Sequence, residues 1–261
     1  MRNIPEDNLA YPVLLKWDTG ITGSSFFLRA DNKMFLVTAK HVLFDKEDLR
    51  GKKIELVCQT RALKDENINK YLIDLTKSKV LKHETADIGA IEIGEIIEIQ
   101  DDGGRLFKFN EGISVIHEVA SGIVSASAGD ATKLLKDVLI SNDVILYGYP
   151  TSLGLRNSPQ FDYNKPLLRK GIIANIYQDG GTIILDCPVY YGNSGGPVVE
   201  VEQDGLTWNH KIIGVVSQFI PFCEHWENKE NGLVNTELSN SGYSVAVAMD
   251  KVFELIGYKT E

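Results

Sequence analysis

Cysteine is scarce in this sequence of 261 residues, which contains only Cys58, Cys187 and Cys223. A small, odd number of cysteines does not suit the disulfide frameworks that stabilise small secreted domains. The first residues also lack the unbroken apolar stretch of a signal peptide, because Glu6 and Asp7 interrupt it. These two absences lead us to expect a reducing, cytoplasmic location.

Long apolar runs and an excess of positive charge are absent as well. No run approaches the roughly 20 apolar residues that a membrane-spanning helix needs. Lysine and arginine number 27 against 36 aspartates and glutamates, so the net charge is -9. Nucleic-acid backbones and anionic membrane surfaces attract cationic proteins, and we therefore expect neither as a partner. The hydrophobic fraction of 43% is ample for a folded core.

Helical periodicity is rare, and short strand-like runs between turn residues dominate. Hairpins are predicted over residues 24–38, 171–186 and 197–217. Further strands are predicted over Val13–Trp17, Lys53–Cys58, Ile88–Ile93, Val144–Tyr147 and Tyr243–Ala248. Helical patterns are confined to residues 39–49 and to the segment after Asp250, which is available as a helix cap. The whole pattern is typical of an all-β protein built from hairpins.

The most informative segment is Gly192-Asn193-Ser194-Gly195-Gly196-Pro197. A nucleophilic serine needs a free hydroxyl, nearby amides that converge on an oxyanion, and room for the substrate. Flanking glycines supply these conditions because they accept unusual backbone angles and carry no obstructing side chain. Taken alone, the same string also fits a glycine-rich hairpin turn, so the interpretation depends on partner residues.

A serine hydroxyl is a weak nucleophile and needs a base, most often histidine. Of the five histidines, His41 alone ends a strong strand-like run, where a rigid strand can direct an imidazole into a cleft. Asp87 stands just before an apolar strand, a costly place for a carboxylate unless it is hydrogen-bonded. It is therefore the preferred acid to orient the base, and Asp74, Asp101 and Asp102 are alternatives in weaker contexts.

The order of His41, Asp87 and Ser194, with the GNSGGP motif, resembles the trypsin-like (chymotrypsin-fold) serine proteases. The serine motif is most similar to that of the bacterial high-temperature-requirement group. The resemblance implies an all-β fold of two six-stranded antiparallel β-barrels with a short C-terminal helix, and no PDZ domain after it. The implied organisation is an N-terminal barrel over residues 11–110, a connection over 111–134, a C-terminal barrel over 135–248, and a helix and tail over 249–261.

The same resemblance implies a serine endopeptidase that forms an acyl-enzyme intermediate and needs no cofactor or metal. Ser194 would be the nucleophile, His41 the general base and acid, and Asp87 the orienting acid. The backbone amides of Gly192 and Ser194, on either side of Asn193, would form the oxyanion hole. Cys223 and His225 are too few to be a structural zinc site.

Substrate binding is assigned by resemblance to two segments. One is the strand whose edge pairs with the substrate backbone, and the other precedes the nucleophile. The residues of these two segments are Val189, Tyr190, Tyr191, Ser217, Gln218 and Phe219. The segment before the nucleophile carries no acid where Arg/Lys-specific members place one, so we predict a small or medium apolar P1 residue.

Asn193 departs from the family's secreted digestive members, which carry an aspartate there that pairs with a newly cleaved N-terminal ammonium. We therefore expect the oxyanion loop to be formed intrinsically or ordered by a partner or substrate. The expected partners are a protein or peptide substrate and, because no pro-segment is visible, a regulatory protein. The alternative is a catalytically silent pseudoprotease that acts as a peptide- or protein-binding module.

Overall fold

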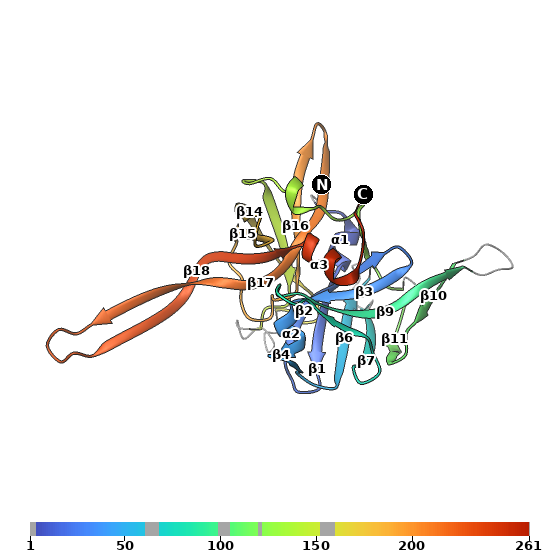
Figure 1. Ribbon diagram of the computed structural model, residues 1–261, viewed down its shortest axis with the longest axis horizontal. Coiled ribbons are helices and arrows are strands. Elements are labelled where there is room, and N and C mark those ends of the chain that lie inside the picture. Colours follow the sequence, from blue (N-terminus) through green and yellow to red (C-terminus); the bar gives the residue numbers. More distant parts are fainter. Residues whose placement is uncertain (1–3, 61–67, 99–104, 120–121, 152–159, 261) are drawn as a thin grey trace.

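The computed structural model describes residues 4–60, 68–98, 105–119, 122–151 and 160–260 of the chain. Two β structures pack against each other, and the C-terminal helix α3 (Met249–Ile256) lies at their junction (Figure 1). The other helices are short: α1 (Glu6–Ala10), α2 (Lys40–Leu43) and a 3-10 turn at Leu135–Asp137. No helix among the described residues is long and apolar enough to cross a membrane.

The first β structure is a curled ten-stranded sheet with the order β10-β9-β3-β2-β1-β6-β7-β11, to which β8 and β12 are attached. Its strands are β1 (Pro12–Trp17), β2 (Thr22–Ala30), β3 (Lys33–Thr38), β6 (Lys53–Gln59), β7 (Ile68–Asp74), β8 (Val80–Lys82), β9 (Gly89–Glu98), β10 (Arg105–Phe109), β11 (Ile113–His117) and β12 (Ala126–Ser127). A separate ribbon pairs β4 (Phe44–Asp45) with β5 (Asp48–Leu49). All pairs in the sheet are antiparallel except β12 with β2.

The second β structure is a closed six-stranded barrel with the order β13-β14-β15-β18-β17-β16. Its strands are β13 (Asp143–Gly148), β14 (Leu167–Tyr177), β15 (Thr182–Asp186), β16 (Pro197–Asp204), β17 (Thr207–Glu227) and β18 (Val234–Ala248). Every pair in it is antiparallel. This barrel agrees with the predicted C-terminal barrel in strand number and direction.

The first sheet differs from the prediction in two ways. It contains more than six strands, because β8, β10, β11 and β12 add to its edges and faces. It also extends beyond the predicted boundary at residue 110, since β11 pairs with β7 and β12 pairs with β2. The segment over 111–134, predicted as the inter-barrel connection, thus includes two short strands that pair with the first sheet.

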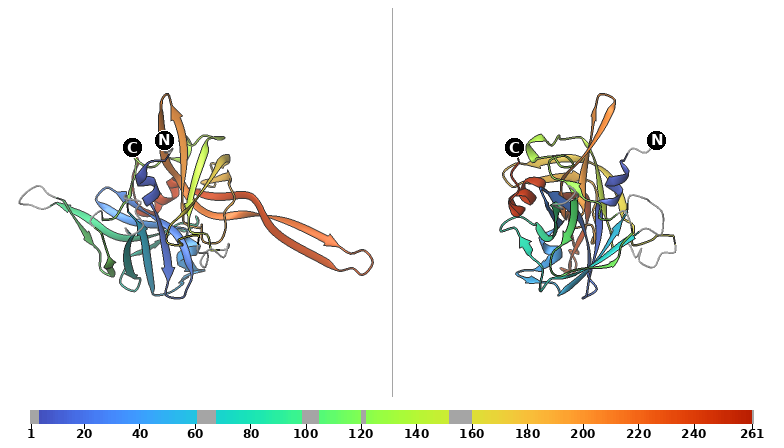
Figure 2. Two further views of the ribbon diagram at one scale, coloured as in Figure 1. Left: turned by 180° about the vertical axis from the view of Figure 1, so that it is seen from behind. Right: turned by 90° about the vertical axis from the view of Figure 1, so that its right-hand side faces the viewer.

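The predicted hairpins all form, and so do the single helical turn after β3 and the C-terminal helix. β17 and β18 form a further hairpin that was not predicted, since only Tyr243–Ala248 was expected as a strand there, and it projects from the barrel as a long two-stranded arm (Figures 1 and 2). Asp250 does not cap helix α3. Its carboxylate instead accepts a hydrogen bond from the Leu135 N–H at 2.8 Å.

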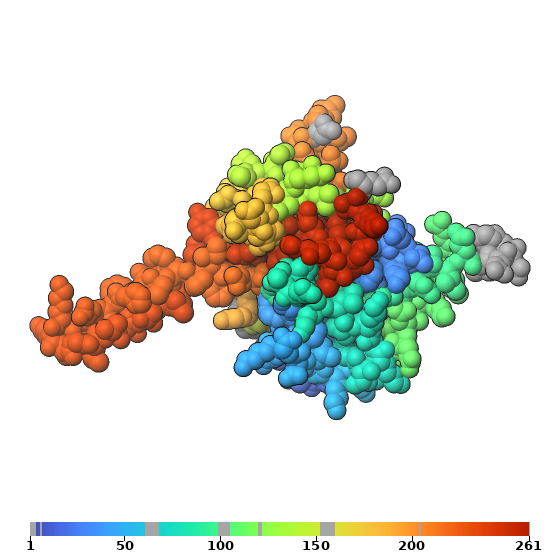
Figure 3. All heavy atoms as spheres, in the orientation of Figure 1, coloured from blue at the N-terminus to red at the C-terminus, as the bar shows by residue number. Residues whose placement is uncertain are grey.

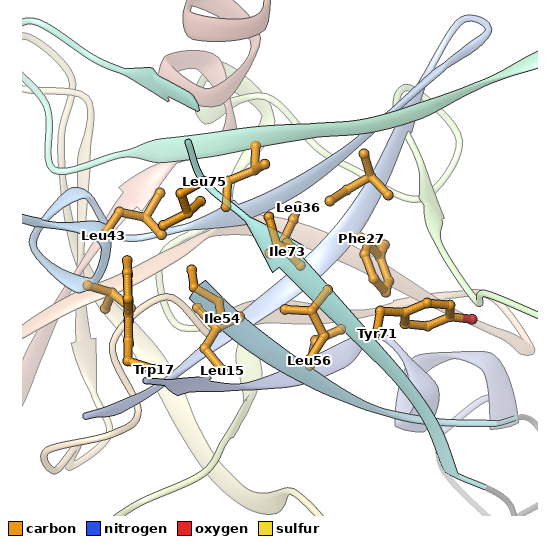
Figure 4. Packing of buried hydrophobic residues seen from close by; sticks show 14 of the residues in the cluster. Leu15, Trp17, Phe27, Leu36, Leu43, Ile54, Leu56, Tyr71, Ile73 and Leu75 are labelled. Carbon is orange, nitrogen blue, oxygen red and sulfur yellow. The ribbon is translucent and has the colours of Figure 1, made fainter. Parts of the chain in front are cut away.

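Alternation along the strands divides the apolar residues among separate cores. Leu15 and Trp17 of β1 and Phe27 of β2 point into the core of the first sheet (Figure 4). Their β2 neighbours Phe26 and Leu28 point the other way, into a cluster shared with strands of the barrel and with α3. This shared cluster fixes the two β structures to each other, and the candidate site lies along the same junction.

Candidate active site

Figure 1 marks the elements that bring His41 and Asp87 together. His41 lies in the helical turn α2, directly after β3, and Asp87 immediately precedes Ile88 and β9, which pairs with β3. The His41 ring Nδ1 lies 2.8 Å from Asp87 Oδ2, and the His41 backbone N–H donates to Asp87 Oδ1 at 3.0 Å. One carboxylate oxygen thus contacts the imidazole and the other holds the backbone of the same residue, and an ionised carboxylate beside Nδ1 assigns the ring proton to that nitrogen.

Asp87 has a third donor from the other β structure. The Ser217 hydroxyl of β17 donates to Asp87 Oδ2 at 2.6 Å. Burial by itself would raise the pKa of Asp87, but the hydrogen bonds from His41 and Ser217 and the proximity of the imidazole outweigh it, so the pKa is lowered. Asp87 is thus an ionised acceptor that holds its neighbours at neutral pH.

The loop that carries Asp87 is itself held by His83, a buried residue. The His83 Nδ1 accepts backbone N–H groups of Thr85 at 3.2 Å and Ala86 at 3.0 Å. The proton must then sit on Nε2, which lies 3.3 Å from Glu254 Oε2 of α3, within ion-pair distance but without hydrogen-bond alignment. His83 therefore has a structural position beside the site, and the sequence pattern did not single it out.

Ser194 lies in the loop between β15 and β16 and faces the same cavity as His41 and Asp87. Its hydroxyl donates to the Ser217 carbonyl at 3.1 Å, and no Ser194–His41 hydrogen bond forms among the described residues. Catalytic hydrogen bonds of this kind often tighten only when substrate is bound. The three predicted triad residues are thus in one cavity, with Ser217 in contact with two of them.

The loop around Ser194 leaves two amides unpaired. Neither the Gly192 N–H nor the Ser194 N–H donates a hydrogen bond to any described residue. The loop carbonyls are held elsewhere: Tyr191 O accepts from the Thr151 backbone at 2.8 Å, and Gly192 O accepts from the Ser24 hydroxyl at 2.6 Å. An oxyanion hole needs amides that are free while the neighbouring carbonyls are fixed elsewhere, and this loop provides both.

Two glycines of the loop are required by conformation and close approach. Gly192 has a φ of 94°, and a Cβ there would lie 2.3 Å from the Tyr149 carbonyl. Gly195 has a φ of 87°, and a Cβ there would lie 2.0 Å from the Thr38 hydroxyl oxygen and 2.1 Å from the Ser24 carbonyl. The loop therefore packs directly on strands of the first sheet, and this contact fixes its position relative to His41, which follows β3.

Asn193 fixes the turn that contains Gly192. Its side chain is buried, with 1% exposed, and its Oδ1 accepts the Tyr190 N–H at 2.9 Å. Its own backbone N–H donates to the Tyr190 carbonyl at 2.9 Å. These two bonds span the turn and are made within the loop itself, while the expectation that the loop is formed intrinsically or ordered by a partner or substrate stays a prediction.

A cavity of about 910 Å³ contains this arrangement. Every predicted site residue except Asn193 lines it, namely His41, Asp87, Val189, Tyr190, Tyr191, Gly192, Ser194, Ser217, Gln218 and Phe219. The Tyr191 and Phe219 rings meet edge to face, with their centres 6.1 Å apart. The guanidinium of Arg169, a residue of β14, lies 4.6 Å from the centre of the Tyr190 ring. Among the described lining residues, Asp87 is the only carboxylate, so the cavity offers no free acid.

Several positions were not identified from the sequence. Ser24 and Thr151 hold the nucleophile loop, yet both are separated from it by long stretches of chain and carry no recognisable motif. Cys223 and His225 lie on the exposed arm with their sulfur and Nε2 atoms 3.5 Å apart. The described residues contain no group of three or more potential metal ligands, and all three cysteines are free thiols.

The sequence matches the family model of the trypsin-like peptidase domain over residues 23–206, which include His41, Asp87 and Ser194. The chain belongs to this family. Its fold is the chymotrypsin-like pair of β structures, mostly strand with a short C-terminal helix. No curated protein matches the chain significantly.

Solved structures extend the comparison to the whole chain. The serine endoprotease from Yersinia pestis is similar with a TM-score of 0.53 and 13% identity, over 98% of this chain and 66% of that one. The HtrA-type protease AlgW, in a structure with a tripeptide, has a TM-score of 0.51 and 14% identity, over 97% of this chain and 62% of that one. This chain thus spans less than two thirds of their lengths. At identities this low, the structural similarity shows a shared fold and nothing more specific.

Proposed function

We propose that this protein is a serine endopeptidase that cleaves peptide bonds through an acyl-enzyme intermediate. One observation carries the proposal: Asp87 holds His41 through both carboxylate oxygens in the cavity that also contains Ser194 and two free loop amides. This combination supplies a base of fixed tautomer, a nucleophile and an oxyanion site. Membership of the trypsin-like peptidase family supports it.

In the proposed reaction, His41 Nε2 takes the proton of the Ser194 hydroxyl as its oxygen attacks the scissile carbonyl. The carbonyl oxygen becomes an oxyanion and accepts the Gly192 and Ser194 N–H groups. The carbon–nitrogen bond then breaks, and His41 donates the proton to the leaving amine. Water, deprotonated by His41, hydrolyses the acyl-enzyme and restores Ser194.

The hydrogen bond between Ser194 and the Ser217 carbonyl supports a role for substrate in aligning the nucleophile. A substrate strand added to β17 would donate a backbone N–H to this same carbonyl. The Ser194 hydroxyl would then lose its present acceptor and be free to turn toward His41. Binding and activation of the nucleophile would occur together.

The proposed substrates have a small or medium apolar residue at P1. The wall residues Val189, Tyr190, Tyr191 and Phe219 are apolar or aromatic, and the described lining residues include no carboxylate beyond the one that holds His41. An arginine or lysine at P1 would lose its hydration without gaining a partner. Cleavage predominantly after arginine or lysine in a peptide library would contradict this assignment.

Labelling with a fluorophosphonate probe tests the proposed nucleophile. We expect labelling of the wild type and its loss in Ser194→Ala, whereas Ser114→Ala, an exposed serine of β11, should label normally. In hydrolysis of peptides with an apolar P1 residue, the wild type and Ser114→Ala should be active and Ser194→Ala inactive. Absence of labelling and hydrolysis, with peptide binding retained, would instead favour the binding-module alternative.

The cytoplasmic location and control by a regulatory partner remain part of this proposal. Three free thiols are compatible with a reducing compartment. Restricted substrate choice would also protect other proteins of the same compartment from cleavage. Indiscriminate degradation of casein by the isolated chain would count against restricted or partner-controlled activity.

A further inference from the structure

The most unusual feature outside the cavity is the arm, defined here as residues 220–242 of β17, β18 and their turn. Figures 1 and 3 show it extending well beyond the rest of the molecule. Large apolar side chains on it are exposed, including Phe222 at 53%, Trp226 at 61% and Leu238 at 66%. An isolated two-stranded ribbon is marginally stable in water, and such apolar exposure marks an interaction surface.

One face of the arm combines aromatic and acidic side chains. Residues directly opposite in an antiparallel pair share a face, and alternate residues of one strand do too. The pairs on this face are Phe222 with Ser239, Glu224 with Glu237, and Trp226 with Asn235. Two glutamates thus face each other between two exposed aromatic rings.

The opposed glutamates have no compensating charge. Neither Glu224 nor Glu237 forms an ion pair with any described residue, and like charges directly opposite in a sheet destabilise the pair. The arm as a whole carries four glutamates and one lysine, Lys229 in the turn. This composition complements a cationic partner and disfavours a second copy of the same acidic arm.

The opposite face gives less reason for a charged partner. It carries Cys223, His225 and Leu238, and its polar groups bond to each other: His225 Nδ1 lies 3.0 Å from the Thr236 hydroxyl. Uncompensated negative charge and exposed aromatic rings thus occur together only on the face that carries Phe222, Glu224 and Trp226, among the described residues of the arm, and we take this face as the binding surface.

The arm is continuous with the proposed substrate cleft. β16 pairs with β17 only as far as Val215, so beyond the cleft the β17 edge away from β18 has no strand partner among the described residues. This edge runs from Ser217 into the arm, interrupted at Pro221, which has no N–H. At the base of the arm, the Asn240 side chain donates to the Val189 carbonyl at 2.7 Å, which ties the arm to the cavity wall.

We propose that the arm docks the substrate protein itself, by binding an extended segment whose arm-facing residues, at every second position, are alternately apolar and basic (lysine or arginine). A substrate strand antiparallel to β17 runs from the arm toward Ser194, so this segment precedes the scissile bond. Its basic side chains meet Glu224 and Glu237, and its apolar side chains pack on Phe222 and Trp226. The inference rests on the proposed function, and it adds that a substrate protein must also carry a segment that binds the arm, outside the cavity.

Binding to the full chain carrying Ser194→Ala tests the arm without cleavage. The probe is a fluorescent peptide of repeating Val-Ser-Lys-Ser, in which valine and lysine take turns at every second position, and its matched peptide has glutamate in place of lysine. Phe222→Ser/Trp226→Ser and Glu224→Gln/Glu237→Gln should each weaken binding of the basic peptide about tenfold, and added salt should weaken it further. Control variants are Trp208→Ser and Glu98→Gln/Glu111→Gln, which change exposed side chains elsewhere and should leave binding unaltered.

Folding and activity controls separate the possible outcomes. Removal of the opposed glutamates should leave the melting temperature equal or higher, so weaker binding by that variant reports docking. With Ser194 intact, arm variants should hydrolyse a short reporter normally and a long basic peptide more slowly. Equal binding of both peptides, unaltered binding by arm variants, or an arm-dependent dimer would overturn the proposal. Failure of the wild type to react with fluorophosphonate would instead overturn the proposed function.

Discussion

Replacement of Asn193 by alanine tests whether the oxyanion loop is held by this buried amide. The change removes the acceptor of the Tyr190 N–H, a bond of 2.9 Å in a position that is 1% exposed. A buried donor left without a partner costs about 1–3 kcal/mol. Asn193→Ala would therefore destabilise the present turn by this amount relative to other conformations of the loop, in which the Gly192 N–H is displaced from the oxyanion site.

This free energy converts directly into a loss of rate. A cost of about 1–3 kcal/mol corresponds to a decrease of about 5- to 150-fold in kcat, which reaches only the lower part of the roughly 100- to 1,000-fold range for complete loss of one oxyanion donor. We expect KM for a short peptide to change little, because the β17 edge remains intact. Steady-state kinetics on that peptide measure both, and Asn209→Ala, an exposed asparagine of β17, is the control.

Asn193→Asp sharpens the same test. The carboxylate retains the acceptor for the Tyr190 N–H but places a charge in a buried position. We expect a lower melting temperature at neutral pH that recovers on acidification, because protonation removes the buried charge. A kcat for Asn193→Ala within twofold of the wild type would refute the argument that this side chain positions the loop.

Other predictions follow from the contacts of the site. Ser217→Ala removes a charge-assisted bond of 2.6 Å to Asp87, and should lower kcat/KM about 10- to 100-fold. The pKa of folded Asp87 is below the unfolded value of about 3.9, so ionised Asp87 stabilises the fold above that pH and loses this effect as pH falls through the folded pKa. The difference in urea stability between wild type and Asp87→Asn should therefore stay constant above about pH 5 and narrow as the pH falls below that, through the folded pKa of Asp87. His83→Ala should lower kcat by displacing the Asp87 loop, and His83→Asn, which retains an acceptor, should partly restore it in the same kinetic assay. Gly195→Ala should lower the free energy of unfolding by more than about 1 kcal/mol, because its φ is 87° and its Cβ would meet Thr38.

The sequence by itself located the strands that carry the site. Alternating apolar runs and turn residues predict the hairpins around β2 and β3, β14 and β15, and β16 and β17, and all of them form. It also identified His41, Asp87 and Ser194 as members of one site, because each stands at a distinctive place relative to a strand. The glycines flanking Ser194 belong to this local information, since backbone angles and close approach restrict those positions to glycine.

The length of the arm illustrates what the local pattern did not reveal. Residues 220–227 alternate apolar and polar side chains poorly, and Pro221 normally interrupts a strand. They are extended because β18 pairs with them residue by residue as far as Glu227. Strand structure there comes from a cross-strand partner, which the preferences of the segment itself do not encode.

The hydrogen bonds that join the two halves of the site were decided only by the tertiary structure. Ser24 reaches Gly192 across the junction of the two β structures, and Ser217 reaches Asp87 across the same junction. A hydroxyl at such a position has no sequence signature, because its partner is chosen by the packing of one sheet on the other. The sequence therefore determined which residues are able to carry the chemistry, and the shared core between the sheets determined how they meet.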